Sequence, residues 1–422
     1  MEDKFIIKGR KPLAGEVEIS GYKNAAGPCL AATLLTDEDV ILDNLPLVKD
    51  VLSMVELLRE MGADINWEEE KRIKINTANL DPQKIDPQKV AKSRISVLLI
   101  GSLLHKTDKF RFFRPGGDRI GLRPLTTHLE ALQQLEVKIS QEGDFLYIRK
   151  ENELEGKEVV LREFSVTATE NVILASVLAK GKTIIKIAAA DPQVQDLCKM
   201  LISMGAKIRG IGTHVLEIEG VKKLKGVSHK ICPDPLEAGT FAIVGAVTKG
   251  KIKIKNIIFD HLTLFLKKLR EIGVDFQREE NNSLLVNFSP NLKATKIQAL
   301  PFPGFPTDLL PVVVPLLTQA EGRSLIHDPL YENRLNYVHE LRKMGADIEL
   351  VDPHRAFVFG KTPLSGVRIE SWDIRAGAAL VVAGLLASGE TIIENVYQID
   401  RGYEKIEEKL QKLGADIKRV KE

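Results

Sequence analysis

The chain has 422 residues, of which 44% are hydrophobic and 28% are charged, and its formal net charge is only +2. This length predicts two domains, and the nearly neutral charge argues against the broad basic surface that nucleic-acid binding needs. The longest apolar run, residues 376–387, is far shorter than the roughly 20 residues of a membrane span. The charged first four residues lack the apolar core of a signal peptide. We therefore expect a cytoplasmic protein.

The chain begins with a predicted strand region at residues 5–19 and then shows a sixfold repeat. Apolar side chains at helical spacing lead each time to a short phrase such as Met61-Gly62-Ala63-Asp64-Ile65. Copies spaced by about 70 residues stand at 61–65, 135–139, 204–208, 272–276, 344–348 and 413–417, the second being degraded to Leu-Glu-Val-Lys-Ile. Glycine is a common left-handed helix stop, so each copy predicts an amphipathic helix, a turn and a strand.

Each repeat also contains a second segment that is apolar on nearly every face, as expected for a helix buried all round. These segments are residues 25–35, 95–104, 172–178, 241–247, 309–317 and 376–386. We therefore predict an α/β protein of two inside-out domains, each with three repeats whose central buried helices are surrounded by sheets and outer helices. The predicted domains are residues 21–232, and residues 1–20 together with 233–422.

Between the first two amphipathic helices lies a loop, residues 113–124, that packing does not account for. Three Gly and two Pro exclude a helix or strand interior. Its three Arg and one Asp suit a mobile lid over an anionic substrate, because Gly permits hinge motion and Arg binds phosphate or carboxylate. A solvated surface turn is the alternative.

In the fifth repeat, one position of the apolar helical stripe is occupied by Arg334, whereas the matching positions of the other copies hold Val, Leu or Tyr. Burying an unpaired guanidinium costs several kcal/mol. Arg334 therefore needs an anionic partner or a cleft, unless it snorkels from a frayed first turn.

The front ends of the six buried segments carry polar residues that simple helix starts do not require, including Lys23, Arg94, Ser165, Asp308 and Arg375. Helix N-termini bind anions, above all beside Lys or Arg. If all six segments begin at a cleft between the domains, these residues converge there. Locally, Asp373 and Thr167 suit helix caps, and His128 suits a packing position.

Cofactor and metal motifs are not found in this sequence. Cys29, Cys198 and Cys232 are far apart, with no CxxC pair, so neither a disulfide framework nor a zinc site is indicated. The eight His form no HxxxH or HExxH pattern, and neither GxGxxG nor GxxxxGK[ST] occurs. We expect no metal and no cofactor.

Six phrases together resemble the UDP-N-acetylglucosamine 1-carboxyvinyltransferases, a family of enolpyruvyl transferases, over essentially the whole chain. They are Ile19-Ser20-Gly21-Tyr22-Lys23-Asn24-Ala25-Ala26, Arg114-Pro115-Gly116-Gly117 through Arg123-Pro124, Phe305-Pro306-Thr307-Asp308, Tyr331-Glu332-Asn333-Arg334, Trp372-Asp373-Ile374-Arg375-Ala376 and Ile399-Asp400-Arg401-Gly402-Tyr403-Glu404. The resemblance implies two inside-out domains with the active site between them. It also implies addition of the sugar 3′-hydroxyl to phosphoenolpyruvate, followed by loss of phosphate.

The resemblance also implies residue roles. Asp308 is the expected base and Asp118 of the lid the expected acid, with Lys23 and Arg401 as further catalytic residues. The expected substrate-binding residues are Lys23, Asn24, Arg94, Arg123, Pro124, Leu125, Thr126, Thr127, Ser165, Val166, Asp308, Leu330, Glu332, Arg334, Asp373, Arg375 and Arg401. The implied partners are phosphoenolpyruvate and UDP-N-acetylglucosamine, without nucleic acid or membrane insertion, and the oligomeric state stays open.

Two positions depart from the common family pattern. Asp118 stands where most relatives have a lid Cys, although some have Asp, and Glu163 stands where many have a Lys near the nucleotide. The alternatives to this reading are the sister enzyme that acts on shikimate 3-phosphate and a catalytically silent binding module built on the same repeats.

We predict that fosfomycin, which alkylates the lid thiol in this family, inhibits this protein poorly, because a carboxylate is a weaker nucleophile toward an epoxide than a thiolate. Asp118→Cys is expected to introduce time-dependent inactivation, measured as loss of phosphate release after preincubation. Rapid inactivation of the unmodified protein would contradict the prediction.

Overall fold

The computed structural model describes residues 3–117 and 120–421 and confirms the α/β class. These residues form two compact units. The N-terminal unit comprises residues 21–117 and 123–232, and the C-terminal unit comprises residues 3–20, 120–122 and 233–421. None of the helices in these described ranges is long and apolar enough to cross a membrane.

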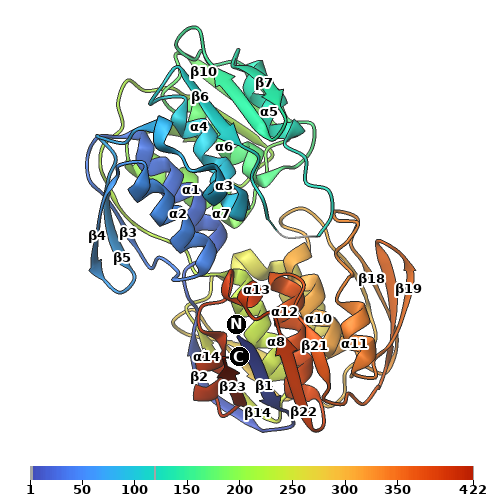
Figure 1. The fold of residues 1–422 in the computed structure, drawn as a ribbon. Helices are drawn as coiled ribbons and strands as arrows, with labels where there is room; N and C mark the ends of the chain where they lie inside the picture. Colours follow the sequence, from blue (N-terminus) through green and yellow to red (C-terminus); the bar gives the residue numbers. More distant parts are fainter. Residues whose placement is uncertain (1–2, 118–119, 422) are drawn as a thin grey trace. The chain divides into compact units, whose positions relative to one another are not determined.

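The N-terminal unit is built around central helices, with α2, α5 and α7 outside them (Figure 1). The central segments are α1 (Lys23–Ala32), the 3-10 turn η3 (Arg94–Leu98) that continues into α4 (Leu99–Leu103), and α6 (Val166–Ser176). The outer helices are α2 (Lys49–Glu60), α5 (Thr126–Gln134) and α7 (Pro192–Ser203), and the short α3 (Pro87–Lys92) precedes η3. Small side chains along α1 allow this close packing, because nine of its ten residues are buried.

Three sheets enclose these helices. The strands are β3 (Val40–Asp43), β4 (Asp64–Glu69), β5 (Arg72–Asn76), β6 (Lys109–Phe113), β7 (Lys138–Glu142), β8 (Phe145–Arg149), β9 (Glu158–Val160), β10 (Lys182–Lys186), β11 (Lys207–Arg209), β12 (Val215–Glu219) and β13 (Ser228–Lys230). The sheet orders are β13-β3-β5-β4, β6-β8-β7 and β11-β12-β10-β9. In two of them a parallel strand joins an antiparallel meander: β13 pairs with β3, and β9 pairs with β10.

The C-terminal unit repeats this plan around α8 (Pro235–Val247), α10 (Leu310–Leu317) and α12 (Ile374–Leu386), which pack on one another (Figure 1). Its other helices are α9 (Thr263–Ile272), α11 (Val338–Lys343), α13 (Tyr397–Asp400) and α14 (Ile406–Lys412). α8 and α12 are almost wholly buried, as their continuous apolar sequences predict.

Three four-stranded sheets surround the C-terminal unit's helices. The strands are β1 (Lys4–Lys8), β2 (Leu13–Glu18), β14 (Gly250–Lys255), β15 (Phe276–Glu279), β16 (Ser283–Asn287), β17 (Lys296–Gln298), β18 (Gly322–His327), β19 (Asp347–Asp352), β20 (Arg355–Gly360), β21 (Arg368–Glu370), β22 (Glu390–Glu394) and β23 (Asp416–Val420). The orders are β15-β16-β14-β2, β17-β18-β20-β19 and β21-β22-β1-β23. The first strand of the chain, β1, thus pairs with the last two strands, β22 and β23.

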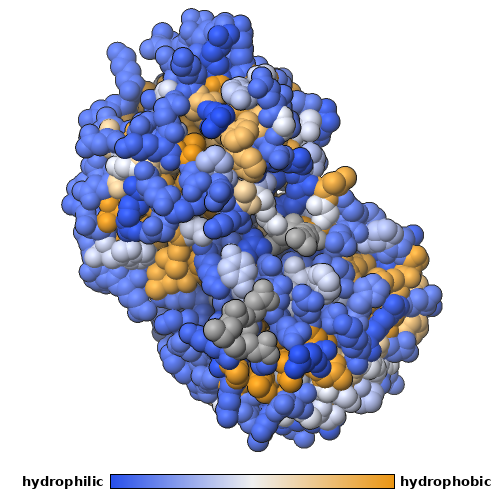
Figure 2. All heavy atoms as spheres, in the orientation of Figure 1, coloured by the Kyte–Doolittle hydropathy of each residue, from blue (hydrophilic) through white to orange (hydrophobic). Residues whose placement is uncertain are grey.

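The many charged residues of the chain, 28% of the total, predict a hydrophilic surface. The face shown in Figure 2 is mostly hydrophilic, and its apolar residues form separate small patches. Scattered exposed apolar side chains such as Val351 are normal for a globular protein.

The left-handed glycines expected after the amphipathic helices are confirmed. In the degraded second copy of the repeat, a residue other than glycine takes this conformation. Gly62, Gly205, Gly273, Gly345 and Gly414 have φ angles between 94° and 106°. At the equivalent position of the second copy, Glu136 also takes a positive φ of 65°. The turn therefore keeps a left-handed residue even without glycine, at a cost of roughly 1–2 kcal/mol for a residue with a Cβ.

We expect Glu136→Gly to stabilise the protein by about 1 kcal/mol, because it relieves the left-handed strain and loses only an exposed ion pair with Lys157. The matched control is Gly205→Ala, where an added Cβ meets nothing within 4 Å and only backbone strain changes. That variant should be less stable. Urea unfolding measures both, and a destabilised Glu136→Gly would contradict the explanation.

Candidate functional site

The C-terminal unit buries one guanidinium against several carboxylates. Arg334 is 1% exposed, and its Nη2 donates to Oδ1 of Asp308. Its Nε donates to the Thr307 hydroxyl (3.3 Å) and lies 3.9 Å from Oδ2 of Asp328, while Nη1 lies 3.9 Å from Oδ1 of Asp373. Burial lowers the pKa of Arg334, but the three carboxylates outweigh it and leave that pKa above its ordinary value. Arg334 therefore has the anionic partner that its burial requires.

The three carboxylates differ in exposure and in local role. Asp328, which follows β18, is fully buried and accepts from the backbone N–H groups of Leu330 (2.9 Å) and Tyr331 (3.3 Å). Asp373 is also buried, and its Oδ1 accepts from the backbone N–H groups of Arg375 and Ala376, both at 2.9 Å. Asp373 is thus the expected cap of α12. The side chain of Asp308 is 28% exposed, so it is the carboxylate of the three that a ligand can reach.

Arg375 also holds Asp308. Its Nε donates to Oδ2 of Asp308 at 3.2 Å, and its guanidinium carbon lies 5.2 Å from the centre of the Tyr403 ring. The Tyr403 hydroxyl is 2.9 Å from that of Thr240 on α8. Each oxygen of Asp308 is therefore bonded to a different guanidinium, and packing from α8 supports one of the two.

Arg401 lies directly after α13 and is 6% exposed. Its Nη1 donates to the side-chain oxygen of Gln398 at 2.9 Å. At the start of α8, Asp234 accepts from the N–H groups of Leu236 (2.7 Å) and Glu237 (3.3 Å). Burial raises the pKa of Asp234 to about 7, although Arg375 and these two hydrogen bonds oppose the shift.

Glu332 binds the end of the loop that contains the predicted lid. Its Oε1 accepts from the backbone N–H of Leu122 at 2.7 Å, and the N–H of Asn333 donates to the carbonyl of Ile120 at 3.1 Å. Gly121 has a φ of 139°, and an added Cβ there would lie 2.4 Å from Oε2 of Glu332. The hydrogen bond from Leu122 lowers the pKa of Glu332. Glu332 was predicted to bind substrate, and here it anchors residues 120–122.

In the N-terminal unit, α1 begins at Lys23. This Lys is 8% exposed, and its Nζ lies 2.9 Å from Oδ2 of Asp50 in the first turn of α2. The side-chain amide of Asn24 donates to the Tyr22 hydroxyl at 3.2 Å. The N-cap residue of α1, Tyr22, makes no side-chain cap hydrogen bond, and the first N–H groups of the helix stand beside the Lys23 ammonium, an arrangement that favours anions.

Arg94 begins η3 and ties it to the segment that leads into α5. Its Nη1 donates to the carbonyl of Arg123 (2.8 Å) and its Nη2 to that of Pro124 (3.2 Å). On α5, Nε2 of His128 lies 2.8 Å from the hydroxyl of Thr167. Burial, followed by Arg94 and Arg123, lowers the pKa of His128 to about 3, so this ring is neutral at ordinary pH. The expected packing role of His128 fits this position.

The start of α6 corrects one local prediction. Ser165 caps the helix by accepting from the N–H of Ala168 at 3.4 Å, whereas Thr167 lies inside the helix. The prediction of Thr167 as a cap was wrong, because its hydroxyl is bonded to His128 instead. Glu163 accepts from the hydroxyl of Thr127 at 2.8 Å.

The predicted residues thus fall into two sets. The set in the N-terminal unit is Lys23, Asn24, Arg94, Arg123, Pro124, Leu125, Thr126, Thr127, Ser165 and Val166, and the set in the C-terminal unit is Asp308, Leu330, Glu332, Arg334, Asp373, Arg375 and Arg401. Asp118 lies outside the described residues. Sequence reasoning missed Asp328, Asp50 and the Tyr403 contact. Asp50 stands in the first turn of a predicted helix, so its only local signal is that of an ordinary helix start.

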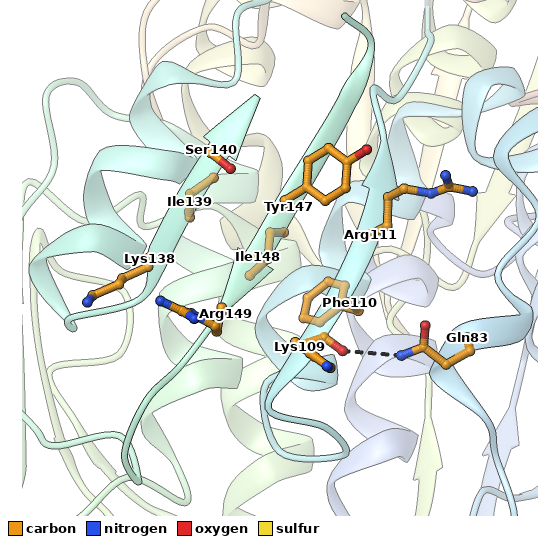
Figure 3. Close-up of a pocket in the computed structure, with 10 residues that line it drawn as sticks. All are labelled: Gln83, Lys109, Phe110, Arg111, Lys138, Ile139, Ser140, Tyr147, Ile148 and Arg149. Carbon is orange, nitrogen blue, oxygen red and sulfur yellow. Dashed lines mark hydrogen bonds between the residues drawn. The ribbon is translucent and has the colours of Figure 1, made fainter. Parts of the chain in front are cut away.

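A depression of about 520 Å³ lies on the sheet β6-β8-β7 of the N-terminal unit (Figure 3). In this close-up the amide of Gln83 points to the backbone oxygen of Lys109, with a hydrogen bond of 3.2 Å. Lys109, Arg149 and Lys138 are directly opposite one another in register across the three strands. None of the predicted site residues lines it.

The sequence of this chain is similar to those of known enolpyruvyl transferases. The profile of the family described as EPSP synthase (3-phosphoshikimate 1-carboxyvinyltransferase) matches residues 7–410. The UDP-N-acetylglucosamine 1-carboxyvinyltransferase of Koribacter versatilis is 44% identical over 423 aligned positions, covering 100% of this chain and 97% of its own. A protein named UDP-N-acetylglucosamine 1-carboxyvinyltransferase 2, from Carboxydothermus hydrogenoformans, is 43% identical, with 99% of each chain covered.

Solved structures confirm the fold. The enolpyruvyl transferase NikO from Streptomyces tendae superposes with a TM-score of 0.90 at 22% identity, covering 99% of each chain. An EPSP synthase from Acinetobacter baumannii gives a TM-score of 0.74 at 19% identity, with 100% of each chain covered. At these identities the likeness concerns the fold alone.

We expect Arg334→Met to destabilise the C-terminal unit by about 3–5 kcal/mol, because it leaves buried carboxylates without their cation. Arg323→Met, at an exposed arginine stacked on Phe357, is the matched control and should cost no more than about 1 kcal/mol. Urea unfolding followed by circular dichroism compares them. An equal decrease in the free energy of unfolding in the two variants would contradict the assigned role of Arg334.

Proposed function

This chain belongs to the UDP-N-acetylglucosamine 1-carboxyvinyltransferase family, and we propose that its two sets of site residues serve one reaction. The protein is a transferase: it moves the enolpyruvyl group of phosphoenolpyruvate to the 3′-hydroxyl of UDP-N-acetylglucosamine. The hydroxyl adds to C2 of phosphoenolpyruvate while C3 gains a proton. Loss of phosphate from C2 and of a proton from C3 of the resulting tetrahedral intermediate then restores the double bond.

The charge of the substrates explains why both sets are rich in cations. Phosphoenolpyruvate and the UDP-sugar together carry roughly five negative charges, which fixed cations must balance locally in a chain of low net charge. Three cations come from each unit: Lys23, Arg94 and Arg123 from the N-terminal unit, and Arg334, Arg375 and Arg401 from the C-terminal unit. We propose that they bind the phosphate and carboxylate groups and stabilise charge that develops on the departing phosphate.

Asp308 is the proposed base, and its geometry is the observation that carries this assignment. Arg334 and Arg375 each bond one carboxylate oxygen, which fixes the orientation of the group. The side chain still keeps 28% of its surface exposed. A positioned, accessible carboxylate can accept the hydroxyl proton of the sugar as it attacks C2.

Asp118 is the proposed acid that protonates C3. A carboxyl can serve in this role once its pKa rises in a site that excludes water. The proposed contacts to the nucleotide and sugar are Asn24, Arg94, Arg123 to Thr127, Ser165, Val166, Asp308 and Leu330. Glu163 is bonded to Thr127, so it is not among the proposed nucleotide contacts, although many relatives are expected to carry Lys at this position.

The second candidate substrate is shikimate 3-phosphate, since the matching family profile and one similar structure carry that activity in their names. The relatives at 43–44% identity, which cover nearly the whole chain, favour the UDP-sugar. We place the reaction at the first committed step of peptidoglycan precursor synthesis, in the cytoplasm, where it would support cell-wall growth, cell shape and division.

Phosphate release from phosphoenolpyruvate, measured with each acceptor, tests the assignment. We expect release with UDP-N-acetylglucosamine and none above background with shikimate 3-phosphate. Asp308→Ala and Asp118→Ala should each lower the rate by at least about 100-fold, because each removes a proton-transfer group. Release with shikimate 3-phosphate alone would overturn the assignment, and no release with either acceptor would favour a silent binding module.

A further inference from the structure

The three cysteines of this chain, far apart in sequence, all belong to the N-terminal unit, and one of them stands beside an aspartate and a histidine. Cys29 lies on α1, Asp196 on α7 and His229 on β13. The Sγ of Cys29, a carboxylate oxygen of Asp196 and a ring nitrogen of His229 all lie within 4.8 Å of one another. Thiolate, imidazole and carboxylate are the ligands that Zn²⁺ prefers.

An ion pair between Asp196 and His229 would be the ordinary explanation of this cluster. It leaves one ring nitrogen of His229 without a hydrogen bond among the described residues. Nε2 of His229 is 3.3 Å from Oδ2 of Asp196, yet this buried nitrogen makes no hydrogen bond within the described part of the chain. Oδ2 of Asp196 instead accepts from the backbone N–H of Cys232 at 3.2 Å. A buried polar nitrogen without a hydrogen bond calls for an explanation, and a bound ion is one.

We propose that Cys29, Asp196 and His229 form a binding site for a divalent transition-metal ion of the zinc type. Around tetrahedral zinc such ligand atoms are separated by about 3.3–3.7 Å, so small rotations of the three side chains bring them into range. On binding, the Cys29 thiol releases its proton to solvent and coordinates as thiolate, while His229 binds as neutral imidazole.

We assign Cys232 as the proposed fourth ligand. It follows His229 by three residues and is 8% exposed. Its backbone N–H holds Asp196 in place, which is the support that a ligating carboxylate needs.

The site would join three elements of the N-terminal unit. α1 carries Lys23 and Asn24 at its start, α7 packs against it, and β13 leads to the end of the unit at residue 232. An ion bound here fixes α1 to α7 and β13 without touching the proposed catalytic residues. Its expected effect is therefore on stability rather than on chemistry.

Co²⁺ added to chelator-treated protein tests the proposal. We expect one equivalent to bind, with a thiolate-to-cobalt charge-transfer band and the strong visible bands of tetrahedral Co²⁺, and Zn²⁺ to displace it. Zn²⁺ should raise the melting temperature by about 5 °C. Cys29→Ser should lower the intensity of the charge-transfer band, and His229→Gln should weaken Co²⁺ binding, with folding checked by circular dichroism.

Cys198→Ala is the matched control. Cys198 is buried on the same helix as Asp196 but is not among the three clustered residues, so its variant should keep the band and the stoichiometry. Absence of a charge-transfer band in the unmodified protein would overturn the proposal. So would a band of equal intensity in Cys29→Ser and Cys198→Ala.

Discussion

The buried guanidinium of Arg334 is the constraint on which the C-terminal set of site residues depends. A cation that is 1% exposed must be surrounded by anions, and Asp308, Asp328 and Asp373 provide them. Asp328 and Asp373 are themselves fixed by backbone N–H groups. The cluster thus has a rigid buried side and one accessible carboxylate, Asp308, which is the arrangement that a positioned base requires.

The repeat explains how such a costly cluster is tolerated. Each central helix contributes continuous apolar packing along its length, as α8 and α12 do, and its first turn is then free to carry polar residues. Free N–H groups at these first turns bind side-chain oxygens, as the carboxylate of Asp373 and the hydroxyl of Ser165 illustrate. The apolar interior stabilises the fold, and the helix starts hold the polar groups.

The sequence predicted the features that follow from periodicity, and it failed where distant segments meet. The buried segments and the left-handed glycine stops were predicted because apolar pattern and glycine act locally. Arg334 was singled out because it breaks an apolar stripe, although the structure places it before α11 rather than on a helix. Thr167 was assigned wrongly because its hydroxyl bonds to His128, 39 residues away. Spacing rules likewise give no signal for the proposed site of Cys29, Asp196 and His229, since metal motifs are recognised only when their ligands are close in sequence.

In the proposed reaction Asp308, oriented by Arg334 and Arg375, accepts the proton of the sugar hydroxyl. The most direct measurement compares, in Asp308→Asn, the binding of UDP-N-acetylglucosamine with the single-turnover rate of phosphate release. We expect binding within a few-fold of that of the unmodified protein and a rate lower by about 100-fold or more. An unchanged single-turnover rate would contradict this role of Asp308.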